Sequence, residues 1–230
     1  MREITKGRVM KILVSFLVPV MFLPGLSAFA QENANALWNY RTGRNLESRN
    51  RITEAEYYYT EAVRICNAEI SRNTAGRDTY TVLTWTLQRQ RKYADVITWG
   101  ERGIRLYADE YRIVQTMGEA YFYLEDYERS LRFMQRYANS VPNGERTSVA
   151  YFFIGEIHRF RRQFRHADIA YTMAVQLEPG LALWWYRLGS VREAAGDFPQ
   201  AVDAYERAVR LNPDYREAND GLARTRRQTG

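Results

Sequence analysis

The chain has 230 residues, of which 46% are hydrophobic and 26% are charged, and its formal net charge is +6. This composition is that of an ordinary globular protein with a sizeable core, so a largely disordered chain is excluded. Four basic residues, Arg2, Lys6, Arg8 and Lys11, fall within the first thirty positions, where Glu3 is the acidic residue. Without that segment 29 basic and 26 acidic residues remain, so the charge gives little reason to expect nucleic-acid binding.

The first thirty residues have the order of a secretory signal peptide. A basic stretch over residues 2–11 precedes an apolar stretch over residues 12–23, and the small residues Ala28 and Ala30 follow. We therefore expect a signal peptide over residues 1–30 that is cleaved after Ala30. The apolar stretch is about twelve residues long, whereas a membrane span takes roughly 20. A periplasmic or secreted protein without a stable membrane span is expected, and an uncleaved leader that anchors the chain is the alternative.

Few residues suit metal binding or catalysis. Cys66 has no cysteine partner for a disulfide or a metal site, and it lies in a helical pattern, so we expect a packed structural side chain. His158 and His166 lack a third or fourth ligand, so no metal site is predicted. Glu125 and Asp126 are interpreted as stabilising a helix start rather than as an acid–base pair. Because the chain also has no Gly-rich phosphate loop and no nucleophile elbow, we predict no enzyme and no cofactor.

The second half of the chain contains an internal repeat with a period of 34 residues. Residues 148–181 and 182–215 carry side chains of the same type at nine or more aligned positions. The aligned pairs are Tyr151/Trp185, Ile154/Leu188, Gly155/Gly189, Phe164/Phe198, Ala167/Ala201, Tyr171/Tyr205, Ala174/Ala208, Leu177/Leu211 and Pro179/Pro213. Their spacing within each segment predicts two amphipathic helices, with a break at residues 195–197 in the second segment. Gly189 and Ala201 have small side chains, and we expect the two helices to approach each other closely at these residues.

This pattern resembles the tetratricopeptide repeat, in which an aromatic residue, Leu-Gly, a second aromatic residue, Ala, a third aromatic residue, Ala and a final Pro recur every 34 residues. The units that fit it, the first two weakly, are residues 36–69, 77–110, 111–144, 148–181 and 182–215. The resemblance implies an all-α fold, a right-handed α-solenoid of about five antiparallel helix pairs. We assign the repeat domain to residues 31–213. Residues 214–230 are assigned to a C-terminal capping helix and tail, because Tyr215, Ala218 and Leu222 have helical spacing among charged residues.

In tetratricopeptide proteins the first helix of each pair lines an extended concave surface. The resemblance places on that face, in chain order, Tyr40, Arg41, Arg44, Thr81, Trp85, Arg89, Gln115, Glu119, Phe122, Tyr123, Phe152, Glu156, Arg159, Phe160, Tyr186, Arg187 and Glu193. Aromatic residues and arginine are enriched in protein-binding hot spots. The candidate partner-binding residues are therefore Tyr40, Arg44, Trp85, Phe122, Tyr123, Phe152, Arg159, Phe160, Tyr186 and Arg187. The alternative is that part of this set packs between adjacent units.

The expected function is that of an exported bacterial scaffold or adaptor in the cell envelope, which binds a peptide or a partner helix in the concave groove. One alternative is arginine-mediated binding of an anionic surface or polymer, since Lys92 is the sole lysine after the leader. Another is an accessory role beside cell-wall enzymes. The two weak N-terminal units either complete the groove or form a homodimer interface.

Overall fold

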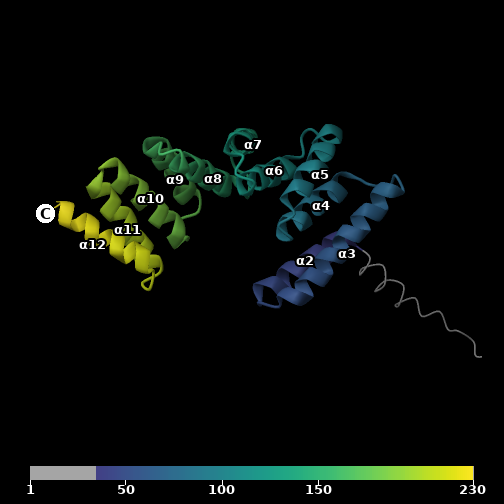
Figure 1. The fold of residues 1–230 in the computed structure, drawn as a ribbon, viewed down its shortest axis with the longest axis horizontal. Helices are drawn as coiled ribbons and strands as arrows, with labels where there is room; N and C mark the ends of the chain where they lie inside the picture. Colours follow the sequence, from purple (N-terminus) through teal and green to yellow (C-terminus); the bar gives the residue numbers. More distant parts are fainter. Residues whose placement is uncertain (1–34, 230) are drawn as a thin grey trace, which may run out of the picture.

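A computed structural model of the chain describes residues 35–229, so the predicted signal peptide and its cleavage site lie outside the described residues. The described residues form eleven α-helices and no strand (Figure 1). The helices are α2 (Ala36–Ser48), α3 (Ile52–Ser71), α4 (Arg77–Arg89), α5 (Tyr93–Leu106), α6 (Tyr111–Tyr123), α7 (Tyr127–Ser140), α8 (Thr147–Phe160), α9 (Phe164–Leu177), α10 (Ala182–Ala195), α11 (Phe198–Leu211) and α12 (Arg216–Thr229). Within these residues no helix is both long enough and apolar enough to span a membrane.

The helices form five consecutive pairs followed by a single helix at the C-terminal end. In each pair a first helix (α2, α4, α6, α8, α10) packs on a second helix (α3, α5, α7, α9, α11), and each second helix contacts the first helix of the next pair. The expected all-α solenoid of antiparallel helix pairs with a C-terminal capping helix is confirmed. The helix α3 continues two residues past the first expected unit, to Ser71.

The stack bends into an arch, with α2–α3 and α10–α12 descending from its two ends (Figure 1). The first helices of neighbouring units contact each other in the pairs α2–α4, α4–α6 and α6–α8, and α10 contacts α12. No two second helices within residues 35–229 make contacts of this extent. The first helices therefore line the inner side of the arch, which we call the concave face.

The turn between the two helices of each unit has the same backbone conformation along the chain. One residue in each turn adopts a left-handed conformation, with φ of 57–61° in the first four units and 82° at a glycine in the fifth. These residues are Asn50, Arg91, Glu125, Arg162 and Gly196. In the third unit Asp126 follows this residue and accepts a hydrogen bond from the Arg129 amide (3.0 Å), which confirms that Asp126 stabilises a helix start.

A glycine of the first helix faces a tyrosine ring of the second helix in three units. The contacts are Gly43 with Tyr59, Gly155 with Tyr171, and Gly189 with Tyr205, and a Cβ added at each glycine would lie 2.6–2.7 Å from a ring carbon. The expected close approach of the two helices at Gly189 is confirmed, and the Tyr205 ring is the group that lies against Gly189. Cys66 is also buried in the core, and burial raises its pKa to about 12, as expected for a packed structural thiol.

The capping helix α12 covers the last unit. Ala218 is fully buried and Leu222 is 9% exposed. Gly221 places the α12 backbone against the outer face of Tyr205, because a Cβ at residue 221 would lie 2.6 Å from that ring. The Tyr205 ring is thus held between Gly189 and Gly221, which fixes α12 on the stack.

Candidate functional site

Four carboxylates on the concave side form ion pairs with an arginine of the next unit along the chain. The inter-unit Glu–Arg pairs, with their shortest N–O distances, are Glu47–Arg89 (2.6 Å), Glu119–Arg146 (2.6 Å), Glu156–Arg187 (3.0 Å) and Glu193–Arg224 (2.6 Å). In every pair the glutamate is less exposed than the arginine, at 8–29% against 29–54% of the side chain. The carboxylates are therefore the deeper partners, and the guanidinium groups face the concave surface.

Three of these glutamates also accept a hydrogen bond from the buried tyrosine of their own unit. The hydrogen bonds run from Tyr59 to Glu47 (2.6 Å), from Tyr171 to Glu156, and from Tyr205 to Glu193 (2.7 Å). Burial raises the pKa of the Tyr171 hydroxyl, and the charge of Glu156 adds to that rise. A hydrogen bond from Arg224 lowers the pKa of Glu193; burial opposes this decrease and the Tyr205 hydroxyl adds to it. Tyr171 therefore stays a hydrogen-bond donor, and Glu193 stays ionised, at neutral pH.

A row of aromatic side chains, which we call the aromatic ladder, connects the second unit to the fifth. Its main line consists of Tyr93, Tyr123, Phe153, Phe152 and Trp184, with successive ring centroids 4.8–6.1 Å apart. A branch consists of Phe122, which lies 4.9 Å from Phe153, and of Tyr127 and Phe160, which stack on each other at 5.4 Å beside Phe122. Aromatic contacts of this kind add about 0.5–1.5 kcal/mol each beyond the burial of area. The ladder therefore holds its rings in fixed positions.

Four of the predicted partner-binding residues are largely packed between units. Tyr40 is 8% exposed and stacks on Trp85 of the next unit at 5.5 Å. Phe122 and Phe152 are half-buried and pack against the apolar clusters of the third to fifth units. For these four side chains the alternative stated from the sequence, packing between adjacent units, describes what the structure shows.

The other three predicted aromatic residues are more accessible. Tyr123 is 50% exposed and Phe160 is 49% exposed, although both rings belong to the aromatic ladder. Tyr186 is half-buried beside Tyr205 (6.0 Å) and Tyr215 (5.1 Å), near the C-terminal end of the stack. The structure thus brings Tyr123 and Phe160 together through Phe122, and it places Tyr186 in a separate cluster.

The three predicted arginines differ in their pairing. Arg44 is exposed, and its guanidinium lies 6.0 Å from the centroid of the Tyr40 ring. Arg159 and Arg187 are half-buried and both pair with Glu156, at 2.7 Å and 3.0 Å. The Nε–H of Arg187 makes no hydrogen bond within the described chain, so its contact with Glu156 is an ion pair only. Two arginines thus share one carboxylate, and the buried Nε–H of Arg187 is left without a hydrogen bond among the described residues.

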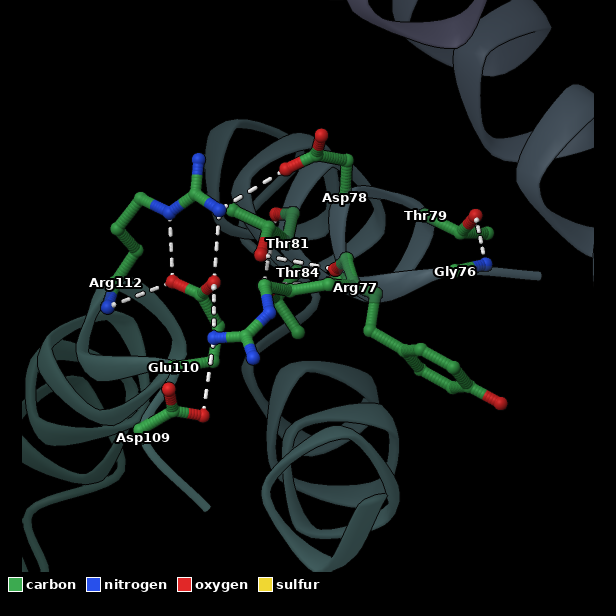
Figure 2. Close-up of polar contacts among 10 residues, drawn as sticks. Gly76, Arg77, Asp78, Thr79, Thr81, Thr84, Asp109, Glu110 and Arg112 are labelled. Atoms are coloured by element: carbon green, nitrogen blue, oxygen red, sulfur yellow. Dashed lines mark hydrogen bonds and ion pairs between the residues drawn. The ribbon is translucent and has the colours of Figure 1, made fainter. Parts of the chain in front are cut away.

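A second polar network joins the starts of α4 and α6 (Figure 2). Glu110 is 4% exposed, accepts a hydrogen bond from the Arg112 amide (3.2 Å) and pairs with the Arg112 guanidinium at 2.6 Å and 2.7 Å. Arg112 also reaches Asp78 (2.9 Å), and Arg77 pairs with Asp109 (3.0 Å). Every carboxylate of the network has an arginine partner, which indicates a structural link between the second and third units. Across residues 35–229 no group of three or more His, Cys, Asp or Glu side chains is placed to hold a metal ion.

Several residues that build this surface were not predicted from the sequence. They are Glu47, Arg146 and Arg224 of the inter-unit Glu–Arg pairs, and Tyr93, Tyr127 and Phe153 of the aromatic ladder. A signal existed for part of the set, because Glu156–Arg187 and Glu193–Arg224 have the same 31-residue separation. The two stacked pairs of the ladder also repeat, because Tyr93 and Tyr127 are 34 residues apart, and Tyr123 and Phe160 hold equivalent positions in the units 111–144 and 148–181. Phe153 left no such signal.

Comparisons with known proteins agree with this architecture. Residues 182–215 match the family model of the tetratricopeptide repeat. The protein O-mannosyl-transferase TMTC1 of Homo sapiens is 28% identical over 101 residues, which span 44% of this chain but 12% of that protein's length. This match is to a short stretch of repeats.

Solved structures share the fold over most of the chain. YrrB, described as a TPR protein with an unusual peptide-binding site, has a TM-score of 0.54 and 17% identity, and the match covers 85% of this chain and 95% of YrrB. MamA from Desulfovibrio magneticus RS-1, solved from residue 41 to its end, has a TM-score of 0.62 and 15% identity, with 78% and 96% covered. At these identities the likeness shows the fold alone. The chain thus has one unit, residues 182–215, that matches the tetratricopeptide repeat model, and its described residues share the α-solenoid fold of solved TPR structures.

Proposed function

We propose that this protein is a non-catalytic scaffold that binds another protein, as an extended peptide or a helix, along its concave face. The observation that carries the proposal is the exposure of Tyr123 and Phe160, two rings of the aromatic ladder that are each about half accessible. Arg159 lies 4.4 Å from the Phe160 ring, so a cation and an apolar surface are offered together. Tyrosine and arginine are enriched among the residues that dominate binding energy.

The packing of these two rings favours binding. Tyr123 stacks on Tyr93 at 4.8 Å, and Phe160 stacks on Tyr127 at 5.4 Å, so one face of each ring is already occupied. A side chain that is held in place before binding loses less rotamer entropy when a partner covers its other face. YrrB, which has this fold, is described as having a peptide-binding site, and this supports a peptide as one form of the partner.

Export and action in the cell envelope are proposed from the sequence. The order of residues 1–30 supports export, and with it a periplasmic or secreted protein that acts in the bacterial cell envelope. Binding of an anionic polymer is less favoured, because the arginines of the inter-unit Glu–Arg pairs already have carboxylate partners. An extended run of unpaired cations is the usual basis for such binding.

The test is affinity capture from the envelope fraction with a double variant, Tyr123→Ser with Phe160→Ser. These residues are preferred to Trp85 and Phe152 because they are more exposed, so their replacement removes less of the packing between units. We expect capture of the bound proteins, measured by mass spectrometry, to fall about tenfold or more, with helical circular dichroism unchanged.

The control carries the same number of polar substitutions away from the ladder. Tyr57 is 68% exposed on α3 and Leu106 is 59% exposed on α5, so Tyr57→Ser with Leu106→Ser removes similar exposed apolar area. Capture by this control is expected to equal that of the wild type. Undiminished capture by the Tyr123 and Phe160 variant would show that the concave face has been assigned wrongly.

A further inference from the structure

The outer face of α9 carries an apolar stripe. Ile169 is 65% exposed, Met173 is 36% exposed and Leu177 is 47% exposed. They follow one another at intervals of four residues, so they lie on the same side of the helix. This side points away from the first helices, and no other element of the described chain covers it. We call these three residues the α9 stripe.

The equivalent side chains of most other second helices are polar. In α5, α7 and α11 the position of Ile169 holds Thr98, Arg132 and Asp203, and the position of Met173 holds Arg102, Arg136 and Arg207. The position of Leu177 is different, because exposed leucines also occur there in α5 and α11, as Leu106 and Leu211. Ile169 and Met173 are thus the departures from the pattern. In α3 the position of Ile169 also holds an exposed aromatic residue, Tyr57, but the position of Met173 holds Glu61. Exposed apolar groups at both positions, which α7 and α11 fill with charged residues, indicate an interaction surface on α9.

A cleft of about 270 Å³ adjoins the stripe between α7 and α9. Its floor includes Tyr151 and Ile154 of α8, and Ile169 forms part of its wall. An apolar side chain of a partner helix lying along α9 would find a concave, partly apolar site beside Ile169. The stripe and the cleft together therefore form one surface for a helix.

Several basic residues near the start of α9 have no ion-pair partner among the described residues. Arg161, Arg162 and Arg165 lie in the turn before α9 and in its first turn, and none of them forms an ion pair within residues 35–229. Cations at a helix N-terminus are unfavourable, because the helix dipole is positive there. The opposite end of α9 carries Glu178 as its C-cap residue. The two ends of the helix thus have opposite charge, and the basic end has no acidic partner in the described chain.

We propose that the α9 stripe is the contact surface of a homodimer in which α9 of one copy packs antiparallel on α9 of a second copy. A two-fold axis at Met173 brings residue 169 opposite residue 177 of the other copy, so Ile169 faces Leu177 and the cleft receives that leucine. The same axis brings the basic end of each helix, with Arg165, to the acidic end of the other, with Glu178. The pattern is therefore self-complementary in both apolar contacts and charge, as an isologous interface requires.

This interface is distinct from the homodimer through the N-terminal units considered from the sequence, and it leaves the concave face free. Stable interfaces bury roughly 800 Å² per partner, and three apolar side chains per copy bury less area than that. We therefore expect a reversible dimer with a Kd on the order of micromolar.

The position of the two-fold axis is tested by Met173→Cys in the full chain. Residue 173 of one copy faces residue 173 of the other, so mild oxidation or a short bis-maleimide should join the two chains. Arg207→Cys, at the equivalent position of α11, is the matched control and should stay a monomer under the same treatment. Cys66 is buried in both variants and does not provide an alternative link. Equal cross-linking of the two variants, or of neither, overturns the proposal.

The association itself is tested by sedimentation equilibrium over a concentration series. The wild-type mass should rise towards that of two chains, whereas Ile169→Asp with Met173→Arg should stay a monomer with unchanged helical circular dichroism. This variant carries the residues that α11 already has at these positions, so the helix is expected to form. Arg165→Glu should weaken the dimer at least several-fold, and adding Glu178→Arg should restore it. A wild type that stays monomeric, or a dimer that the stripe variant leaves intact, contradicts the proposal.

Discussion

A glycine faces a tyrosine ring in the first, fourth and fifth units, and this contact sets how closely the two helices of each unit approach. The sequence predicted this close approach at Gly189. It did not predict that the ring of Tyr205 fills the space, because periodicity assigns a residue to a face of a helix and does not give the direction of its side chain. The repetition of the Gly–Tyr pair at a constant separation of 16 residues would have supplied that information.

The Gly155–Tyr171 contact gives a prediction for stability. A Cβ at residue 155 would lie 2.6 Å from two carbons of the Tyr171 ring, and the ring is fully buried. Gly155→Ala is therefore expected to lower the free energy of unfolding, measured by urea denaturation, by about 1–3 kcal/mol. Gly180→Ala is the control, because nothing lies within 4 Å of a Cβ there, and it should change stability little. A Gly155→Ala protein as stable as the wild type would contradict this account of the packing.

The turn residue Arg162 gives a prediction of the opposite sign. Its φ of 58° is left-handed, which costs an L-residue about 1–2 kcal/mol, and glycine avoids this cost at some loss of entropy on folding. Arg162→Gly is expected to raise the free energy of unfolding by about 0.5–1 kcal/mol. Gly196→Arg, which gives the fifth unit the turn residue of the fourth, should lower it by a similar amount. Thermal or urea unfolding measures the change in the free energy of unfolding for both variants. Changes of the same sign in the two variants would contradict the prediction.

At the scale of the helix, the inter-unit Glu–Arg pairs connect each first helix to the next unit. The helices themselves were predicted well, because hydrophobic spacing and the breaks between repeats depend on neighbouring residues. The pairs were not predicted, since Glu119 and Arg146 are 27 residues apart whereas Glu47 and Arg89 are 42 apart. Which arginine reaches a given glutamate depends on the angle between units, and that angle is a property of the packed stack.

The Glu193–Arg224 pair predicts how stability depends on pH. The pKa of Glu193 is lowered in the folded protein by the Arg224 hydrogen bond, so its ionised form stabilises the fold above the unfolded pKa of about 4.3. This contribution is lost as the pH falls through the lower folded pKa. Glu193→Gln should cost about 1 kcal/mol at pH 7, and the difference from the wild type should shrink by pH 3.

Urea unfolding at the two pH values measures this difference. Asp203→Asn is the control, because Asp203 is exposed on α11 and forms no ion pair within the described residues. Its effect should be small at both pH values. A Glu193→Gln difference that stays constant from pH 7 to pH 3 would show that the carboxylate charge does not stabilise the contact between α10 and α12.

At the scale of the whole molecule, the arch turns the first helices inward and thereby selects which side chains a partner can reach. The sequence predicted the correct helices for this face, because the repeat register identifies the first helix of each unit. It could not separate Tyr40, which is buried against Trp85, from Tyr123, which is half exposed. That separation depends on how the rings of successive units stack across the unit boundaries.

Binding of partners along the concave face can be tested by site-specific photo-cross-linking in cells. A photoreactive amino acid replaces Tyr123 or Phe160 on the concave face, and Arg102 or Arg136 on the outer faces of α5 and α7 as controls. We expect adducts with the same partner from both concave positions and none from the two controls. Adducts confined to the outer positions, or equally frequent at all four, would contradict it.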